Sequence, residues 1–118
     1  MALKDSREGR ELRLEQGDRL RCSGGNSGTT SRLYPAYYQN AIAVAATDNK
    51  DQKASFSTYG SSWVDLAAPG ENVFSTTPNH DFKNRTINGH SKYYDYGSGT
   101  SMSSPMVAAT AALVWSTS

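Results

Sequence analysis

Apolar residues in this chain gather in short runs, and each run is followed by residues typical of turns. Residues 41–48 read "AIAVAATD", a continuous apolar run that ends at Asp48-Asn49. Such a short, unbroken run favours a β-strand that is buried on both faces. Residues 63–70, "WVDLAAPG", predict a second strand that Pro69-Gly70 would stop, and residues 72–77, "NVFSTT", predict a third.

Polar residues separate these runs from each other and from the last quarter of the chain. Residues 49–55 are polar and predict a surface loop. Residues 78–92 are also polar and predict a loop or a loose hairpin, with Asn88-Gly89 as its turn. We find no internal repeat. The pattern of runs predicts strands and loops in alternation, followed by one terminal helix.

A helix is predicted to begin at Ser101, after the glycine-containing stretch "GSGT". Pro105 fits the first turn of such a helix, where the N–H that proline lacks is not needed. The apolar residues lie on nearly every side of the helix, so the pattern predicts a buried helix. The apolar residues of this predicted helix are Met102, Met106, Val107, Ala108, Ala109, Ala111, Ala112, Leu113 and Val114.

Composition divides the chain near Cys22. Residues 1–22 hold six Lys/Arg and five Asp/Glu, whereas the remainder is rich in Ser, Thr, Ala, Gly and Tyr. Gly9 and Gly17 interrupt any helical pattern in the first segment. We expect residues 1–22 to form a short exposed helix or to be disordered, with a charged docking arm as the alternative.

Length and charge limit the classes of function. The chain has 118 residues, enough for one small domain, and its formal net charge is +1. That balance gives no reason to expect a nucleic acid or an anionic membrane as a partner. The longest apolar run is far shorter than the ~20 residues of a membrane span. The first residues lack the apolar core of a signal peptide, and the single cysteine cannot form an intramolecular disulfide.

Ser101 is the candidate for chemistry. At the start of a buried helix its hydroxyl would lie at the positive end of the helix dipole, beside unpaired N–H groups. Gly97 and Gly99 would let the backbone turn and a substrate approach. These conditions suit an acyl-transfer nucleophile, but an N-cap is what serine most often provides at such a junction. The spacing alone leaves both interpretations open.

The stretch "GTSMSSP" followed by "MVAATAAL" resembles the nucleophile segment of the subtilisin-like serine peptidases, the subtilases. That segment reads G-T-S-M-[AS]-x-P-[HM]-V-A-[GA]. Upstream and in the same order, "GGNSG", "YPAYYQNAIAVAATD" and "KASFSTYGSSWVDLAAPGENVFST" resemble further family segments, and their wording is nearest the thermitase type. The resemblance covers residues 23–118.

The resemblance implies a partial three-layer α/β/α domain with a mainly parallel sheet, truncated at its N-terminal side. Residues 23–118 would be the C-terminal part of a peptidase domain, and residues 1–22 would not be homologous to it. Ser101 would be the nucleophile, and the Asn26 amide would donate to the oxyanion. Ser23, Gly24 and Gly25 would form one wall of the substrate pocket, and Thr100, grouped with them, would buttress the turn.

The resemblance also shows what the chain lacks. The family's aspartate lies in a D-[ST]-G turn and its histidine in an H-G-T helix start, and neither motif occurs here. His80 and His90 lie in the polar loop, where exposed histidines are ordinary. We therefore expect a serine endopeptidase by family that is inactive alone. The alternative is a non-catalytic remnant that acts as a binding or structural module.

Further expectations follow from the same resemblance. The substrate would be a polypeptide, the parent protein would be secreted, and the missing N-terminal part of the domain would be a partner. No cofactor is required for the chemistry. A structural calcium or sodium ion would be bound by Asp65 with the carbonyls of Ala36, Tyr38 and Ala41. The alternative for Asp65 is that it caps a local turn.

Overall fold

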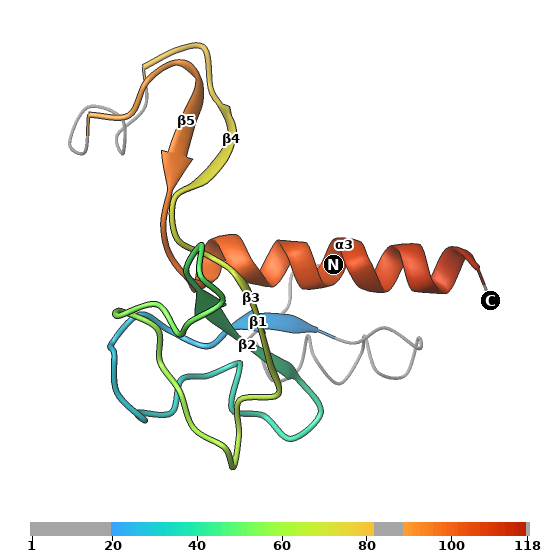
Figure 1. Ribbon diagram of the computed structural model, residues 1–118. Helices are drawn as coiled ribbons and strands as arrows, with labels where there is room; N and C mark the ends of the chain where they lie inside the picture. Colours follow the sequence, from blue (N-terminus) through green and yellow to red (C-terminus); the bar gives the residue numbers. More distant parts are fainter. Residues whose placement is uncertain (1–19, 82–88, 118) are drawn as a thin grey trace.

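The computed structural model describes residues 20–81 and 89–117, and Figure 1 traces the elements along the chain. The predictions for residues 1–19 lie outside these described residues. The elements assigned within the described ranges are β1 (Arg21–Ser23), β2 (Ile42–Thr47), β3 (Leu66–Pro69), β4 (Val73–Thr77), β5 (Tyr93–Gly97) and α3 (Thr100–Ser116).

The three strands β1, β2 and β3 form a parallel sheet in that order. The central strand β2 has Ala43, Val44 and Ala46 fully buried, which confirms the prediction from the continuous apolar run. The run ends in the predicted turn, where Asp48 Oδ1 accepts the N–H groups of Lys50 and Gln52. Parallel pairing fits a strand whose two faces are both covered.

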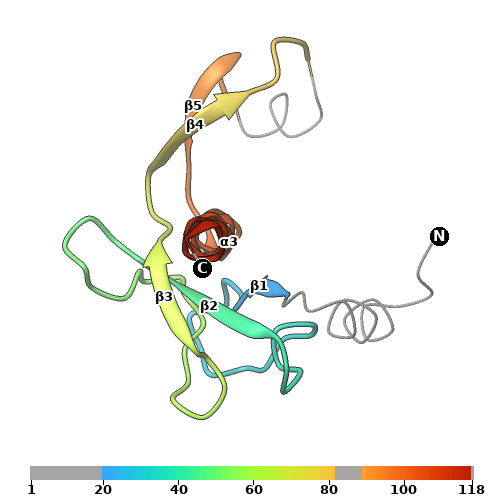
Figure 2. The ribbon, with the colours of Figure 1, turned by 90° about the vertical axis from the view of Figure 1, so that its right-hand side faces the viewer.

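Helix α3 lies on one face of this sheet, while most of the loops that connect the strands lie on the other, as Figure 2 shows. Two serines of the first helical turns hold it there. Ser103 Oγ donates to the carbonyl oxygen of Ala68 at 2.9 Å, and Ser104 Oγ donates to that of Arg21 at 2.9 Å. The chain therefore has a partial α/β fold with a parallel sheet and a helix packed across it.

Strands β4 and β5 form a separate antiparallel pair that projects from the sheet and helix (Figure 1). We call this pair the arm. The prediction of a strand over residues 72–77 is confirmed, but the strand at residues 93–97 was not predicted. The loop or loose hairpin predicted over residues 78–92 connects these two strands, and most of it, including Asn88 of the expected turn, lies outside the described residues. Phe74 contacts the rings of Tyr94 and Tyr96, at centroid distances of 5.7 and 5.1 Å.

The strand predicted over residues 63–70 is shorter than expected. Strand β3 covers only Leu66–Pro69, because the N–H groups of Trp63 and Val64 bond to the carbonyl oxygen of Gly60 in a turn. The strand ends before Gly70, as predicted.

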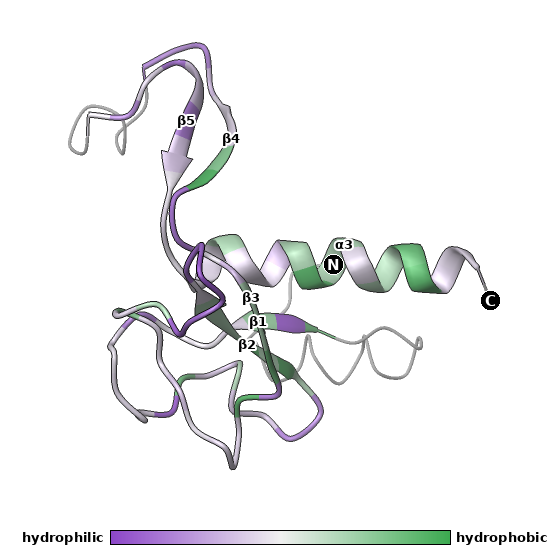
Figure 3. Ribbon diagram, in the orientation of Figure 1, coloured by the Kyte–Doolittle hydropathy of each residue, from purple (hydrophilic) through white to green (hydrophobic). Residues whose placement is uncertain are grey.

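The prediction that the helix is buried on every side is wrong for this chain. Only Thr100 and Ser103 of α3 are buried. Leu113 and Val114 are 70% and 65% exposed, and Figure 3 shows apolar residues along a helix that the described elements cover on one side only. The apolar side chains of α3 would be stable if buried, but the sheet covers only one side of the helix. No helix in residues 20–81 or 89–117 is long and apolar enough to cross a bilayer.

Candidate active site

Ser101 is the second residue of α3 and is exposed. The first N–H groups of a helix have no acceptor within the helix. Here the N–H of Thr100 bonds to Asn26 Oδ1, and the N–H of Met102 bonds to the carbonyl oxygen of Gly99. The N–H of Ser101 has no hydrogen-bond acceptor among the described residues. Both the hydroxyl and the N–H of Ser101 are thus available at the positive end of the helix.

The side chain of Asn26 is fixed against the residue that precedes Ser101. Its Oδ1 accepts two hydrogen bonds from Thr100, one from the backbone N–H and one from Oγ1, both at 2.9 Å. Because Oδ1 is held by two donors, the amide nitrogen is the end that remains free to donate. A Cβ at Gly99 would lie 3.4 Å from Nδ2, so a side chain there would crowd the amide. The structure thus brings Asn26 to the start of the helix from 74 positions away.

The loop that carries Asn26 is braced by a neighbouring loop. Thr58, which is buried, accepts the N–H of Ser27 on its Oγ1 and donates its own N–H to the carbonyl oxygen of Gly25. The N–H of Gly25 in turn bonds to Thr100 Oγ1 at 3.1 Å. Thr100 therefore joins the Asn26 loop to the helix. Thr58 was not singled out from the sequence, although it lies in the stretch "KASFSTYG" that resembles a family segment.

A pocket of 430 Å³ opens beside Ser101. Of the four predicted substrate-binding residues, only Ser23 lines it. Gly24 is buried instead, and a Cβ there would lie 3.0 Å from the carbonyl oxygen of Val44, so its small size serves the contact between β1 and β2. The lining residues are Arg21, Cys22, Ser23, Leu33, Tyr34, Pro35, Ser101, Ser104 and Pro105.

Two features of that pocket were missed from the sequence. Leu33, Tyr34 and Pro35 form part of its lining, and the only signal was the Tyr-Pro pair within the resemblance. Cys22 also contributes to the lining, and burial raises the pKa of its thiol. Cys22 is thus a neutral packing group here rather than a thiolate.

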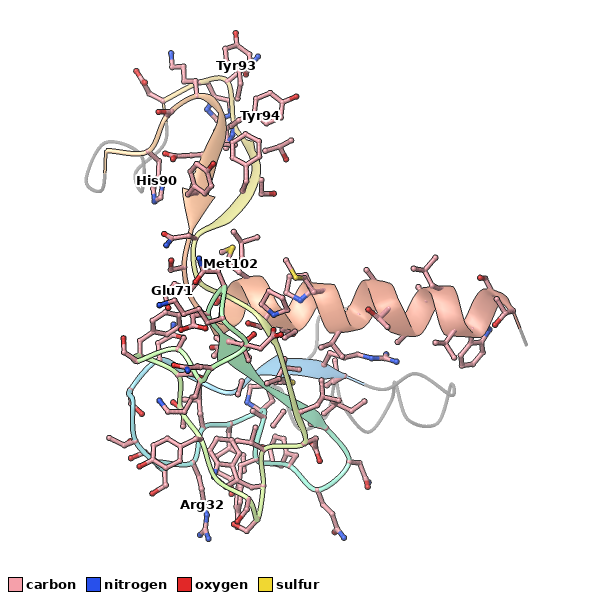
Figure 4. All side chains as sticks on the ribbon, viewed as in Figure 1. Arg32, Glu71, His90, Tyr93, Tyr94 and Met102 are labelled. Carbon is pink, nitrogen blue, oxygen red and sulfur yellow. The ribbon has the colours of Figure 1, made fainter. Side chains whose placement is uncertain are left out.

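Neither histidine lies at this pocket. His80 is exposed, and its Nδ1 is 3.0 Å from the carbonyl oxygen of Asp81. His90 precedes strand β5 of the arm, and its Nδ1 is 3.2 Å from Asp95 Oδ2. Figure 4 labels His90 beside β5 and Met102 near the start of the helix, and these two residues line a different pocket, of 390 Å³. The chain has two histidines in all, so it places no imidazole at Ser101.

The residues predicted to hold a cation come together in part. Tyr38, Ala41 and Asp65 line one pocket, which Ala36 does not line. Asp65 Oδ2 accepts the N–H of Ala43 at 2.8 Å, and this bond ties the carboxylate to strand β2. The donor set of one carboxylate and backbone carbonyls suits a hard cation. Groups of three or more His, Cys, Asp or Glu side chains suited to a metal do not occur in the described part of the chain.

Comparisons with known proteins agree on one family. The model of the Subtilase family matches residues 11–118, so the match includes part of the charged first segment. Thermitase of Thermoactinomyces vulgaris is 46% identical over 99 residues, which cover 84% of this chain and 31% of thermitase. Subtilisin BL of Lederbergia lenta is 47% identical over 92 residues, which cover 78% of this chain and 29% of that protein.

The solved structure of the prenylagaramide maturation protease PagA is similar to this chain, with a TM-score of 0.75 and 28% identity. The similar region covers 90% of this chain and 35% of that protein. This chain therefore spans about a third of the length of the relatives that it matches.

Proposed function

Because the chain belongs to the subtilase family, we propose that it is the nucleophile-bearing part of a serine endopeptidase domain. Ser101 is the nucleophile, and Asn26 and the Ser101 N–H are the two oxyanion donors. The observation that carries the proposal is the pair of bonds from Thr100 to Asn26 Oδ1. They leave Nδ2 as the donor, next to Gly99 and Thr100, the two residues that precede Ser101.

In the proposed reaction, Ser101 Oγ attacks the carbonyl carbon of a peptide bond. The carbonyl oxygen becomes an oxyanion, which Nδ2–H of Asn26 and the N–H of Ser101 stabilise. Removal of one such donor typically lowers the rate by ~10²–10³. The base that takes the Ser101 proton passes it to the amide nitrogen, so that collapse of the tetrahedral intermediate releases the amine and leaves an ester on Ser101. Water then hydrolyses that acyl-enzyme to release the acid and restore the Ser101 hydroxyl.

The proton of the Ser101 hydroxyl needs an acceptor that this chain does not place there. A serine hydroxyl without a base is a poor nucleophile near neutral pH. His90 is held by Asp95 on the arm, and His80 lies beyond strand β4. We therefore propose that the chain alone is inactive and that the base and its orienting carboxylate come from another part of a subtilase domain.

The remaining parts of the proposal follow from the family. The substrate is a polypeptide, and the parent protein is secreted. A calcium or sodium ion is bound at the pocket of Tyr38, Ala41 and Asp65, where it ties the loop before β2 to the start of β3. The ion has a structural role and takes no part in the chemistry.

A serine-directed phosphonate tests the function. Mass spectrometry is expected to find no adduct on the isolated chain, because no base activates Ser101. We expect an adduct on Ser101 when the chain is mixed with the segment of thermitase that precedes its matched region. The Ser101→Ala variant should give none, and Asn26→Ala should slow labelling by ~10²-fold or more.

The control is Asn79→Ala, which changes an exposed asparagine of the loop after β4. It should leave labelling unchanged. Labelling of Ser101 in the isolated chain would contradict the need for an external base. Absence of labelling in a mixture in which the two polypeptides are shown to associate would contradict the assignment of Ser101.

A second candidate is a non-catalytic binding or structural module. The observation that favours it is the exposed apolar surface of α3, which is suited to association whether or not Ser101 reacts.

A further inference from the structure

The pocket of 390 Å³ lies where the arm meets the start of α3, and it shares no lining residue with the pocket beside Ser101. Figure 4 shows Met102, the residue after Ser101, at the base of the arm and His90 farther along it. A polypeptide held at Ser101 therefore has two separate pockets within reach. We call this second one the arm pocket, and its lining includes Val73, Ser75, His90, Asp95, Gly97 and Met102.

The strand register makes the arm pocket apolar at one end and polar at the other. Val73 pairs with Gly97, and Ser75 pairs with Asp95, two positions farther from the helix. Residues two apart along a strand lie on the same face of it, so both pairs face the pocket. The apolar end is formed by Val73 and Met102, and the polar end by Ser75 and Asp95.

Gly97 leaves space at the apolar end. A Cβ at this position would lie 3.4 Å from Sδ of Met102, so a side chain there would point toward a residue that lines the same pocket. Gly97 is not among the glycines with a positive φ, and its backbone therefore does not require a glycine. A glycine within a strand often marks a place that a ligand approaches closely.

Asp95 gives the arm pocket its charge. Its Oδ1 accepts the N–H of Tyr96 and its Oδ2 accepts that of Ser91, both at 2.7 Å, while His90 Nδ1 lies 3.2 Å from Oδ2. A carboxylate has about four acceptor positions, so one on Oδ1 remains. The side chain is 25% exposed, which leaves it accessible to a ligand. The described lining includes no lysine or arginine.

We propose that the arm pocket binds a lysine or arginine side chain of the polypeptide substrate, close to the scissile bond, and that Asp95 selects it. This inference rests on the proposed function. A basic side chain has an aliphatic stem and a cationic head, which match the two ends of the pocket. The stem lies against Val73 and Met102, in the space that Gly97 leaves. The head donates a hydrogen bond to Asp95 Oδ1.

The length of the pocket suits such a side chain. Two residues along a strand span about 7 Å, so the carboxylate lies about one long side chain away from Gly97. A glutamate in the same place would bring a second negative charge to Asp95. A leucine would fill the apolar end and leave the acidic end to water. The pocket therefore favours a basic side chain over an acidic or a purely apolar one.

Binding of a small probe to the chain tests this assignment. Nα-acetyl-lysine methylamide is compared with Nα-acetyl-norleucine methylamide, which has the same stem without the ammonium group. Nuclear magnetic resonance follows the methyl signal of Met102, which is identified by its loss in Met102→Leu. We expect the lysine probe to bind at least ~5-fold more tightly, because its ammonium group meets a partly buried carboxylate.

Two variants change the two ends of the pocket. Asp95→Asn removes the charge and should make the affinities for the two probes equal. Gly97→Val fills the apolar end with a residue that suits a strand, and it should abolish binding of both probes.

A third variant guards against a general effect on the arm, because Asp95→Asn also alters an acceptor of two backbone N–H groups. Ser75→Lys keeps Asp95 and places a tethered ammonium group opposite it, so it should also remove the preference for lysine. The matched control is Asp48→Asn. Asp48 likewise accepts two backbone N–H groups, those of Lys50 and Gln52, but it does not line the arm pocket. The preference should persist in this control.

The remaining outcomes also decide the question. Equal affinity of the unchanged chain for the two probes, or a Met102 signal that neither probe moves, would overturn the assignment. So would a preference for lysine that persists in both Asp95→Asn and Ser75→Lys. A preference for lysine without phosphonate labelling of Ser101 would retain the arm pocket and overturn the peptidase function. Labelling without the preference would do the reverse, so the two failures are distinguishable.

Discussion

At the scale of the residue, Thr100 is the side chain on which the geometry of the candidate site depends. It is fully buried, and its hydroxyl donates to Asn26 Oδ1 while accepting the N–H of Gly25. Its backbone N–H donates to the same amide oxygen. One residue therefore orients the proposed oxyanion donor and joins the Asn26 loop to the helix that carries Ser101.

Replacement of that hydroxyl tests its part in stability. Thr100→Val keeps the β-branched shape but leaves the Gly25 N–H without an acceptor, so we expect a loss of about 1–3 kcal/mol in the free energy of unfolding. Urea denaturation followed by tryptophan fluorescence measures it. Thr110→Val is the control, because the exposed Thr110 hydroxyl bonds to the Met106 carbonyl oxygen of its own helix. Equal losses in the two variants would show that Thr100 has no special role.

At the scale of the element, the arm is organised by one carboxylate. Asp95 accepts the N–H of Ser91 and of Tyr96, both at 2.7 Å, and the His90 ring lies 3.2 Å away. The N–H of Ser91 first, that of Tyr96 next, and then His90 lower the pKa of Asp95 below its usual value. The ionised carboxylate of Asp95 is thus the form that accepts these hydrogen bonds and fixes the residues that lead into β5.

Acidification should therefore loosen the arm. A carboxylate with a lowered pKa in the folded state contributes stability that is fully present above its unfolded pKa, about 4. That contribution is lost as the pH falls through the lower folded value. We expect the near-ultraviolet circular dichroism of the Phe74, Tyr94 and Tyr96 cluster to fade below about pH 4. In Asp95→Asn the fade should be absent, and an unchanged acid transition in that variant would point to another carboxylate.

At the scale of the whole molecule, the described core is thin. One cluster of buried residues in the described part of the chain consists of Cys22, Ala36, Ala41 and Ala43, with Leu20, Tyr38 and Trp63 packed against it. Small side chains bury little apolar area each, while larger apolar residues of α3 and the arm are exposed. The molecule is suited to gain stability from a partner.

Binding should raise stability by mass action. A partner that binds the folded chain alone, at a free concentration of 100 times its Kd, adds about 2.7 kcal/mol. We expect this gain for the chain with the thermitase segment, measured by urea denaturation at fixed partner concentration. Leu113→Lys at the same partner concentration should lose most of the gain. A gain that is equal in the variant would place the binding site away from the exposed apolar residues of α3.

Several features could be predicted from single stretches of sequence. The apolar run at residues 41–48 predicted strand β2, and "GTSMSSP" predicted both the start of α3 and the family. Asn26 and Ser101 were selected because the stretches around them resemble subtilase segments that occur in the same order. These features depend on local chemistry or on motif spacing, which a linear sequence records.

The tertiary structure decided the rest. Only the fold pairs β4 with β5 outside the main sheet, turns Gly24 against β2 rather than toward the pocket, and brings Leu33 and Tyr34 beside Ser101. The exposure of Leu113 and Val114 on α3 also emerged only from the fold. An apolar pattern states which side chains are stable when buried, but whether they are buried depends on which other elements the same molecule supplies.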